Sequence, residues 1–248
     1  MKNELFELAV MAAMRIPPKN VIGTKTEHRV HGTLKYFFQP NDEYHEVKVE
    51  EFICDATDSD FYEITEIQTK SFGLLRKKLE KLLQSHPVTV IYPIISEKRI
   101  ISIYSESGET TVRKSPKKST LYDTVSELSA IREFLPHRNL TIKAVYLKID
   151  ETRIFNGTKE SRKPFQKPVS VEKVPTELIK IENIDYPNFY LSFLTNISAE
   201  SFTSSDFAKA NSVSVAEARY LLYLLNELGL VRRIGKEKKA YIYVKAAT

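Results

Sequence analysis

The sequence predicts an α/β protein in two parts: a mixed sheet flanked by helices, then a smaller helical module that ends in a hairpin. Three observations support this. A helical stretch over residues 71–85 leads into a continuous apolar run at 88–95, as in a strand covered on both faces. Residues 151–177 are rich in Lys and Pro, which is typical of a linker or extended arm. Residues 178–248 return to helical periodicity and end in two β-rich runs. We therefore expect domains at 1–150 and 178–248.

The composition is that of a folded protein. Its 248 residues are 42% hydrophobic, which is enough for one large domain or two modest ones. The single cysteine, Cys54, excludes an internal disulfide framework and a multi-cysteine zinc site. No apolar run approaches the roughly 20 residues that span a bilayer, and Glu4 and Glu7 make residues 1–15 an amphipathic helix rather than a signal peptide. We expect a cytoplasmic protein with no membrane partner.

Local signals assign elements within residues 1–150. Thr24 and Glu27 have the spacing of a capping box, opening a helix whose apolar face includes Val30 and Leu34 and which Pro40 ends. The remaining predicted elements are β-rich runs at 47–56 and 61–69, a hairpin of 100–104 with 109–113 around Gly108, a helix at 121–135 and a strand at 141–149.

Two carboxylates are expected to meet on the first pair of strands. Asp55 lies on one strand and Glu66 on the next, and alternation places Gln68 on the same face as Glu66. With the carbonyl of Ile67 between them, these oxygens would suit Mg²⁺ or Mn²⁺. Such an ion supplies hydroxide and charge stabilisation for phosphodiester cleavage.

This arrangement over residues 24–95 resembles the PD-(D/E)XK nuclease superfamily, the restriction-endonuclease-like fold. The resemblance implies that Asp55 and Glu66 are the motif carboxylates, with Glu27 as an additional one from the helix. The motif lysine is replaced by Gln68, which carries no charge. Lys70, Lys77, Lys78, Lys114 or Lys117 would have to supply it; we favour Lys114 or Lys117, because residues 113–118 form a basic loop after the sheet.

Each of these residues also has an ordinary explanation. Glu27 fits the capping box as well as it fits a metal site. Asp55 would end a strand beside a turn, and Glu66 with Gln68 would form a polar stripe on a half-exposed strand. The five histidines are scattered, and we interpret them as surface or core imidazoles rather than as zinc ligands.

The C-terminal segment has clear helix and hairpin signals. After a helix at 190–197, capping residues open a short helix at 204–210, and Ser214 with Glu217 caps a longer helix that Gly229 ends. Its predicted buried face is Val215, Ala218, Leu222, Leu225 and Leu228. Two β-runs, 230–234 and 240–244, follow around a basic tip. This order resembles the winged helix-turn-helix superfamily.

The resemblance implies that the longer helix enters the major groove of DNA and that the hairpin touches the backbone. From Ser205 onward the sequence has eight Lys/Arg and only four Asp/Glu, and this excess of positive charge favours a polyanionic partner. The residues expected to contact DNA are Arg219, Tyr220, Tyr223, Arg232, Arg233, Lys236, Lys238 and Lys239. The alternative is that the module serves protein–protein contact and that its charged tip is merely solvated.

Three functions remain open at this stage. The first is a Mg²⁺-dependent DNA endonuclease, in restriction or another defence role, acting on double-stranded DNA and possible as a homodimer. The second is a DNA-binding regulator or adaptor whose nuclease-like domain has lost catalysis. The third is an RNA-directed nuclease. Asp55 and Glu66 favour the first function, whereas Gln68 favours the second.

Overall fold

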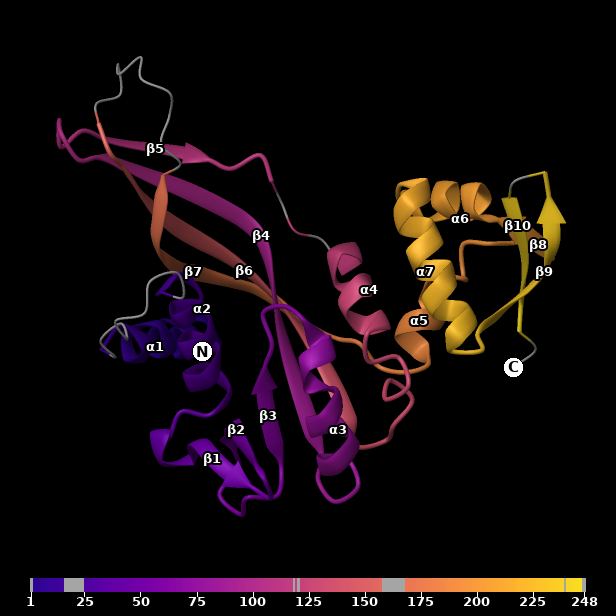
Figure 1. The fold of residues 1–248 in the computed structure, drawn as a ribbon, viewed down its shortest axis with the longest axis horizontal. Coiled ribbons are helices and arrows are strands. Elements are labelled where there is room, and N and C mark those ends of the chain that lie inside the picture. Colours follow the sequence, from indigo (N-terminus) through magenta and orange to yellow (C-terminus); the bar gives the residue numbers. More distant parts are fainter. Residues whose placement is uncertain are drawn as a thin grey trace. The chain divides into compact units, whose positions relative to one another are not determined.

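The computed structural model is an α/β protein with a large mixed sheet flanked by helices (Figure 1). It describes residues 2–15, 25–117, 119, 121–157, 168–238 and 240–246. The chain divides into two compact units. Unit 1 comprises residues 1–69, 89–120 and 143–182, and unit 2 comprises residues 70–88, 121–142 and 183–248.

Unit 1 has its core between two helices and the sheet. The helices are α1 (Lys2–Arg15) and α2 (Lys25–Phe38), and they pack on each other and on the sheet (Figure 1). The core combines Phe6 of α1, Leu34 of α2 and alternate residues of the strands, Ile91, Val145, Leu147 and Ile149 among them. Side chains that alternate along a strand point to one face, so this row meets the helices. The predicted helix ending before Pro40 is confirmed.

The sheet has seven strands in the order β1-β2-β3-β4-β6-β7, with β5 also paired to β4. After a short 3-10 turn (Asp42–Tyr44), the first strands are β1 (His45–Val49), β2 (Phe52–Thr57), β3 (Ile64–Ile67), β4 (Val88–Tyr104) and β5 (Thr110–Lys114). The β4–β5 hairpin around Gly108 is confirmed, with Ile101 opposite Val112. The single β-run expected at 47–56 is instead an antiparallel hairpin of β1 with β2, which turns at Glu50 and Glu51.

The expected linker at 151–177 is the main correction. Strand β6 (Leu140–Phe155) continues past residue 150, and β7 (Val169–Asn183) is the last strand in the sheet order. Residues 158–167 lie outside the described part. An edge strand tolerates proline and many charges because only one of its sides is hydrogen-bonded. The composition around Pro175 therefore looked like a linker although the segment is a strand, and the domain boundary expected at 178 lies within β7.

Unit 2 joins the C-terminal segment to two earlier pieces of the chain. The earlier pieces contribute a 3-10 turn (Phe72–Leu75), α3 (Arg76–Leu82) and α4 (Leu121–Ser129). The C-terminal segment contributes α5 (Asn188–Ser192), β8 (Ser201–Thr203), α6 (Ser204–Asn211), α7 (Val215–Glu227), β9 (Val231–Glu237) and β10 (Ala240–Lys245). The strands form a three-stranded antiparallel sheet in the order β8-β10-β9. Helix α4 packs on α7, so the expected domain at 178–248 is only part of this unit.

Helix α7 begins and ends where its sequence predicts. The Ser214 side chain accepts a hydrogen bond from the Glu217 N–H, and the Glu217 carboxylate accepts one from the Ser214 N–H, the reciprocal pattern of a capping box. Gly229 has a φ of +71°, a left-handed conformation that favours glycine after a helix. The buried face differs in detail, because Leu221 and Leu224 join Ala218, Leu222 and Leu225 in the core while Val215 stays 37% exposed.

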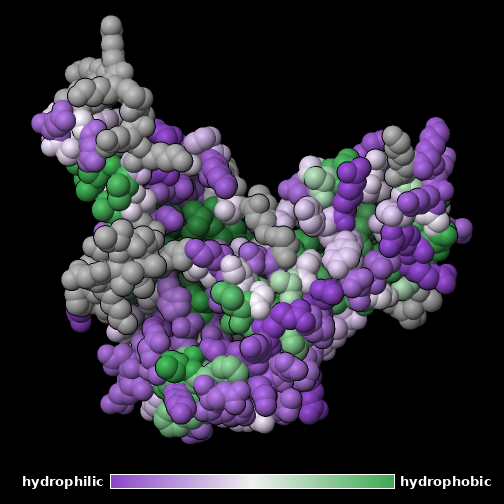
Figure 2. Space-filling view, viewed as in Figure 1, coloured by the Kyte–Doolittle hydropathy of each residue, from purple (hydrophilic) through white to green (hydrophobic). Residues whose placement is uncertain are grey.

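The visible surface is largely hydrophilic, with separate apolar patches (Figure 2). Over the part of unit 2 that holds β9 and β10, hydrophilic residues predominate, as the basic sequence of that hairpin requires. None of the described helices is both long and apolar enough to cross a membrane.

Candidate functional sites

Asp55 of β2 and Glu66 of β3 come together as the sequence predicts. Strands β2 and β3 are antiparallel with Ala56 opposite Thr65, so the next pair along this register is Asp55 and Glu66. The Asp55 N–H donates to Glu66 Oε1 at 3.4 Å, and the Ile67 N–H donates to Asp55 Oδ2 at 2.7 Å. The Glu66 side chain is buried, with the residue only 4% exposed. Two carboxylates thus lie beside each other at the sheet surface.

Helix α2 supplies basic groups to this pair. His31 Nε2 lies 3.2 Å from Asp55 Oδ1, and the buried Lys35, one turn later, forms an ion pair with Glu46. Burial raises the pKa of the Asp55 carboxyl. The hydrogen bond and charge of His31, the Ile67 N–H and the charge of Lys35 outweigh that effect, so the Asp55 pKa lies below its ordinary value. Asp55 is therefore held as a carboxylate by groups of this chain.

These contacts bear on the expected Mg²⁺ site. Asp55 already uses Oδ2 for the Ile67 N–H and Oδ1 for His31, an imidazole rather than the oxygen ligand that Mg²⁺ prefers. Within the described residues, no group of three His, Cys, Asp or Glu side chains is placed to hold a metal ion. The Glu27 side chain lies outside the described part. The residues described here do not, by themselves, fit a complete Mg²⁺ site.

The replacement for the motif lysine is not where the sequence analysis placed it. Lys114 is 62% exposed at the end of β5 and pairs with Glu97 of β4, at 2.6 Å. Within unit 1, β5 lies well away from β2 and β3 (Figure 1). Lys117 is exposed just after β5, where its N–H donates to Ser115 Oγ. Gln68 extends the sheet instead, through its N–H to the Ile91 carbonyl at 2.9 Å. The charges that act on Asp55 come from His31 and Lys35 of α2.

His31 and Lys35 were missed by the sequence analysis. A signal for them exists, since they are four residues apart and flank the apolar face that includes Val30 and Leu34. The sequence alone did not reveal that this edge of the helix would lie over Asp55.

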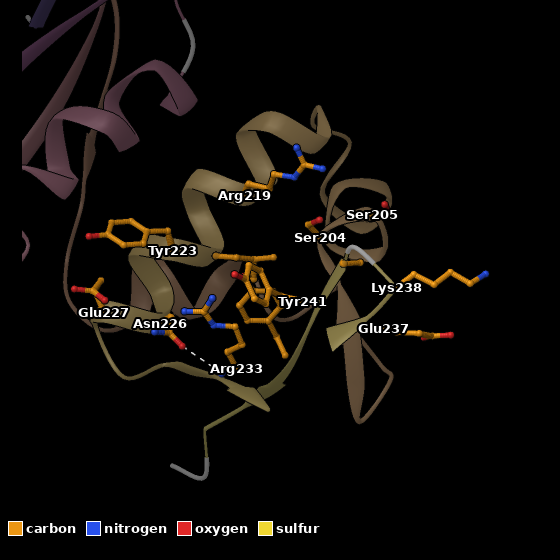
Figure 3. A pocket seen from close by; sticks show the side chains of 13 residues that line it. Ser204, Ser205, Arg219, Tyr223, Asn226, Glu227, Arg233, Glu237, Lys238 and Tyr241 are labelled. Carbon is orange, nitrogen blue, oxygen red and sulfur yellow. Dashed lines mark hydrogen bonds between the residues drawn. The ribbon is translucent and has the colours of Figure 1, made fainter. Parts of the chain in front are cut away.

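Unit 2 holds a groove of about 830 Å³ between α7 and the β9–β10 hairpin (Figure 3). Its lining mixes cationic, aromatic and small polar side chains. The lining residues are Ser204, Ser205, Arg219, Leu222, Tyr223, Asn226, Glu227, Arg233, Glu237, Lys238, Ala240, Tyr241 and Tyr243. Helix α7 contributes one wall with Arg219 and Tyr223, and the hairpin contributes the other with Arg233 and Tyr241 (Figure 3).

Aromatic contacts position the cations of the hairpin. The guanidinium of Arg233 lies 4.1 Å from the ring centre of Tyr241, and the Lys236 ammonium lies 4.5 Å from the same ring. The hydrogen bond from Lys236, together with its charge and that of Arg233, lowers the pKa of Tyr241. The Arg233 N–H donates to Asn226 Oδ1 at 3.2 Å, which ties β9 to α7 (Figure 3). This hydrogen bond links the two walls of the groove.

The residues predicted to contact DNA divide into three groups. Arg219, Tyr223, Arg233 and Lys238 line the groove. Tyr220 is 60% exposed on α7, Arg232 is exposed on β9, and Lys236 reaches Tyr241 from β9. Lys239 lies outside the described residues. Ser205, Asn226 and Tyr241 also line the groove, and the sequence did not point to them as binding residues, although a polar Asn226 among the leucines of α7 departs from the apolar pattern of that helix.

The chain belongs to the family described as "Domain of unknown function (DUF8091)", whose match spans residues 28–185. This span contains β1 to β7 with Asp55 and Glu66, and it ends before the groove-lining residues. The chain is also similar to an "Uncharacterized protein" of Treponema pallidum (strain Nichols), with 28% identity over 224 residues, which cover 90% of this chain and 87% of the relative. No solved structure matches the chain.

Proposed function

We propose that the protein binds duplex DNA through the groove between α7 and the β9–β10 hairpin, as a winged helix-turn-helix. The order α5, β8, α6, α7, β9, β10 is what that resemblance implies, with β8 completing a three-stranded sheet. In this reading α7 enters the major groove and the hairpin is the wing that follows the backbone. The observation that carries the proposal is the placement of Arg219, Arg233 and Lys238 around one groove.

The chemistry of the lining supports a nucleic acid as the ligand. Arginine side chains bind phosphate oxygens and guanine edges through a planar fork of donors, and tyrosines pack on sugars and bases. Two acidic residues also line the groove, but Glu227 is paired to Arg132 of the same unit at 3.1 Å. The cationic side chains therefore dominate the charge presented to a phosphate backbone.

The direct test is a titration of the full chain against duplex DNA of unrelated sequences, read by fluorescence anisotropy. Affinity should fall by about tenfold or more between 50 and 200 mM salt, because each phosphate contact releases counterions. Replacing Lys236 and Lys238 with alanine should weaken binding to all sequences alike, since wing contacts are to the backbone. The proposal would be ruled out if the chain does not bind DNA at low salt, or if its DNA affinity does not change with salt concentration.

A second candidate function, phosphodiester hydrolysis in unit 1, is favoured by the adjacency of Asp55 and Glu66. The chain order α2, β1, β2, β3, α3, β4, with β1 to β4 consecutive in the sheet, is also what the PD-(D/E)XK resemblance implies. Gln68 and the contact of His31 with Asp55 favour the alternative, a nuclease-like unit that serves a DNA-binding regulator or adaptor.

Cleavage assays separate these two readings. A nuclease should nick plasmid DNA with Mg²⁺ or Mn²⁺, be silent in EDTA, and lose activity in Asp55→Asn while still binding DNA. Asp58→Asn, in the neighbouring turn, is the matched control and should keep activity. Gln68→Lys restores the family motif and should raise the rate. If wild type and Gln68→Lys are both inert on duplex, branched and single-stranded DNA and on RNA, the regulator reading stands.

A further inference from the structure

Helix α1 of unit 1 is apolar on both of its sides. Its inner side, with Phe6, Ala9 and Ala13, is buried in the core at exposures of 2–4%. Its other side carries four large apolar side chains in solvent, namely Leu5 (52% exposed), Leu8 (61%), Met11 (56%) and Met14 (44%). A surface helix with solvent on one side ordinarily carries polar residues there. Exposed apolar side chains gathered on one helix side are typical of a contact surface.

The centre of that side is one narrow stripe. Glu4, Leu8, Met11 and Arg15 are separated by four, three and four residues, which is the spacing of a single helix face. All four are exposed. The stripe therefore has an acidic end, an apolar middle and a basic end, and Leu5 and Met14 flank it on either side.

This pattern is complementary to itself when reversed. If a second α1 runs antiparallel across a two-fold axis between Leu8 and Met11, Leu8 faces Met11 of the second copy and Glu4 faces its Arg15. Leu5 and Met14 lie on opposite flanks of the stripe and border the interface, and every contact within the stripe occurs twice, as an isologous interface requires. We infer that a second copy of this chain docks on α1, through antiparallel α1–α1 pairing.

The charges argue for a protein partner over a lipid surface. Glu4 and Glu7 lie in the first two turns of α1, where they would repel anionic headgroups. A helix of 14 residues is about 21 Å long, so the pair buries less than a standard interface. The dimer is therefore expected to be weak, forming at high protein concentration and dissociating at low protein concentration.

Sedimentation equilibrium of the full chain, from about 1 to about 200 µM, measures the dimer directly. Wild type should shift from monomer to dimer across this range. Leu8→Glu combined with Met11→Glu should stay monomeric throughout. Both side chains are more than half exposed, so the thermal unfolding midpoint should not change. Leu74→Glu is the matched control at another exposed leucine (79%), and it should dimerise like wild type.

Charge exchange then tests the antiparallel register. Glu4→Arg alone and Arg15→Glu alone should each be monomeric at concentrations where wild type dimerises, because each places like charges opposite one another. The two variants mixed should form a heterodimer, since every facing pair is then of opposite charge. Glu4→Arg combined with Arg15→Glu should dimerise as wild type does.

Two results would overturn the inference. One is a wild-type chain that stays monomeric throughout the range, including one that instead sediments with anionic vesicles. The other is a dimer that persists in the Leu8→Glu, Met11→Glu variant or in both single charge variants, which would place the interface elsewhere.

Discussion

Three cations of unit 1 and two cations of the β9–β10 hairpin are held in different ways. In unit 1, Lys35 is paired with Glu46, Lys98 with the buried Glu151, and Arg99 with Asp150. In unit 2, Arg233 of the groove lining and the neighbouring Lys236 instead lie against the ring of Tyr241. A tyrosine ring orients a cation without cancelling its charge, whereas a carboxylate cancels it. These unit 1 cations are neutralised by carboxylates of the same chain, whereas Arg233 and Lys236 keep the charge that the proposed DNA contact requires.

Charge reversal in the groove should give the largest effect. Arg219→Glu combined with Arg233→Glu replaces two cations on opposite walls with anions, and we expect duplex DNA affinity to fall by about 100-fold or more at low salt. Both side chains are exposed, and the Arg233 bond to Asn226 uses the backbone N–H, so the fold should be kept.

The control for that experiment lies in unit 1. Arg99→Ala removes an exposed arginine that is already paired with Asp150. Its DNA affinity should stay within about twofold of wild type. If Arg99→Ala weakens binding as much as the groove variant does, the contrast between the two units is wrong.

A second prediction concerns the internal charges of unit 1. Burial raises the pKa of Glu151, but hydrogen bonds from Arg153 and Lys98 lower it by more. The net pKa is about 2, against an ordinary 4.5. A carboxyl whose pKa is lower in the folded chain than in the unfolded chain stabilises the fold at any pH above the unfolded pKa. That stabilisation is lost as the pH falls from about 4.5 to about 2. Glu151→Gln should therefore lose on the order of 1–2 kcal/mol at pH 7, after discounting for solvent screening.

The pH dependence makes that prediction specific. Chemical denaturation of wild type and Glu151→Gln at pH 7 and near pH 2.5 should show the difference shrinking in acid. An equal difference at both pH values would mean that Glu151 contributes by packing rather than by charge.

A third prediction concerns the cap of α7. Ser214→Ala removes the side-chain acceptor for the Glu217 N–H and should cost about 1 kcal/mol, seen as a lower thermal midpoint. DNA affinity measured well below that midpoint should change little, because Ser214 is outside the groove lining. A large loss of DNA affinity at a temperature where the variant is fully folded would instead show that the N-terminus of α7 contacts DNA directly.

The smallest expected effect concerns Tyr241. Tyr241→Leu removes the ring on which Arg233 and Lys236 lie, and DNA affinity should fall roughly threefold. Tyr241→Phe keeps the ring and should bind like wild type. If Tyr241→Phe and Tyr241→Leu have the same DNA affinity, the ring does not orient the cations.

The sequence predicted best those features that depend on neighbours along the chain. The Ser214–Glu217 capping box and the helix end at Gly229 each involve residues only a few positions apart. These local signals predicted correctly where α7 begins and ends. The meeting of Asp55 with Glu66 was also predictable, because a short antiparallel connection determines the facing pairs.

Features that depend on distant contacts were not predictable in the same way. The composition of residues 151–177 predicts a linker, because Pro175 and many charges suit an edge strand as well as a coil, but residues 169–177 belong to β7. β8 has three residues and forms only because β10 pairs with it. The contact of His31 with Asp55, and the pairing of Lys114 with Glu97 rather than with the motif, follow from how α2 and β5 pack on the sheet.

The measurement that tests the central claim most directly is the salt dependence of DNA binding in the full chain and in Arg219→Ala combined with Arg233→Ala. If both groove arginines contact phosphates, the slope of log affinity against log salt should be shallower in the variant by about 2, since each lost contact removes about 0.9. Equal slopes and equal affinities would contradict the account, because the groove would then play no part in holding DNA.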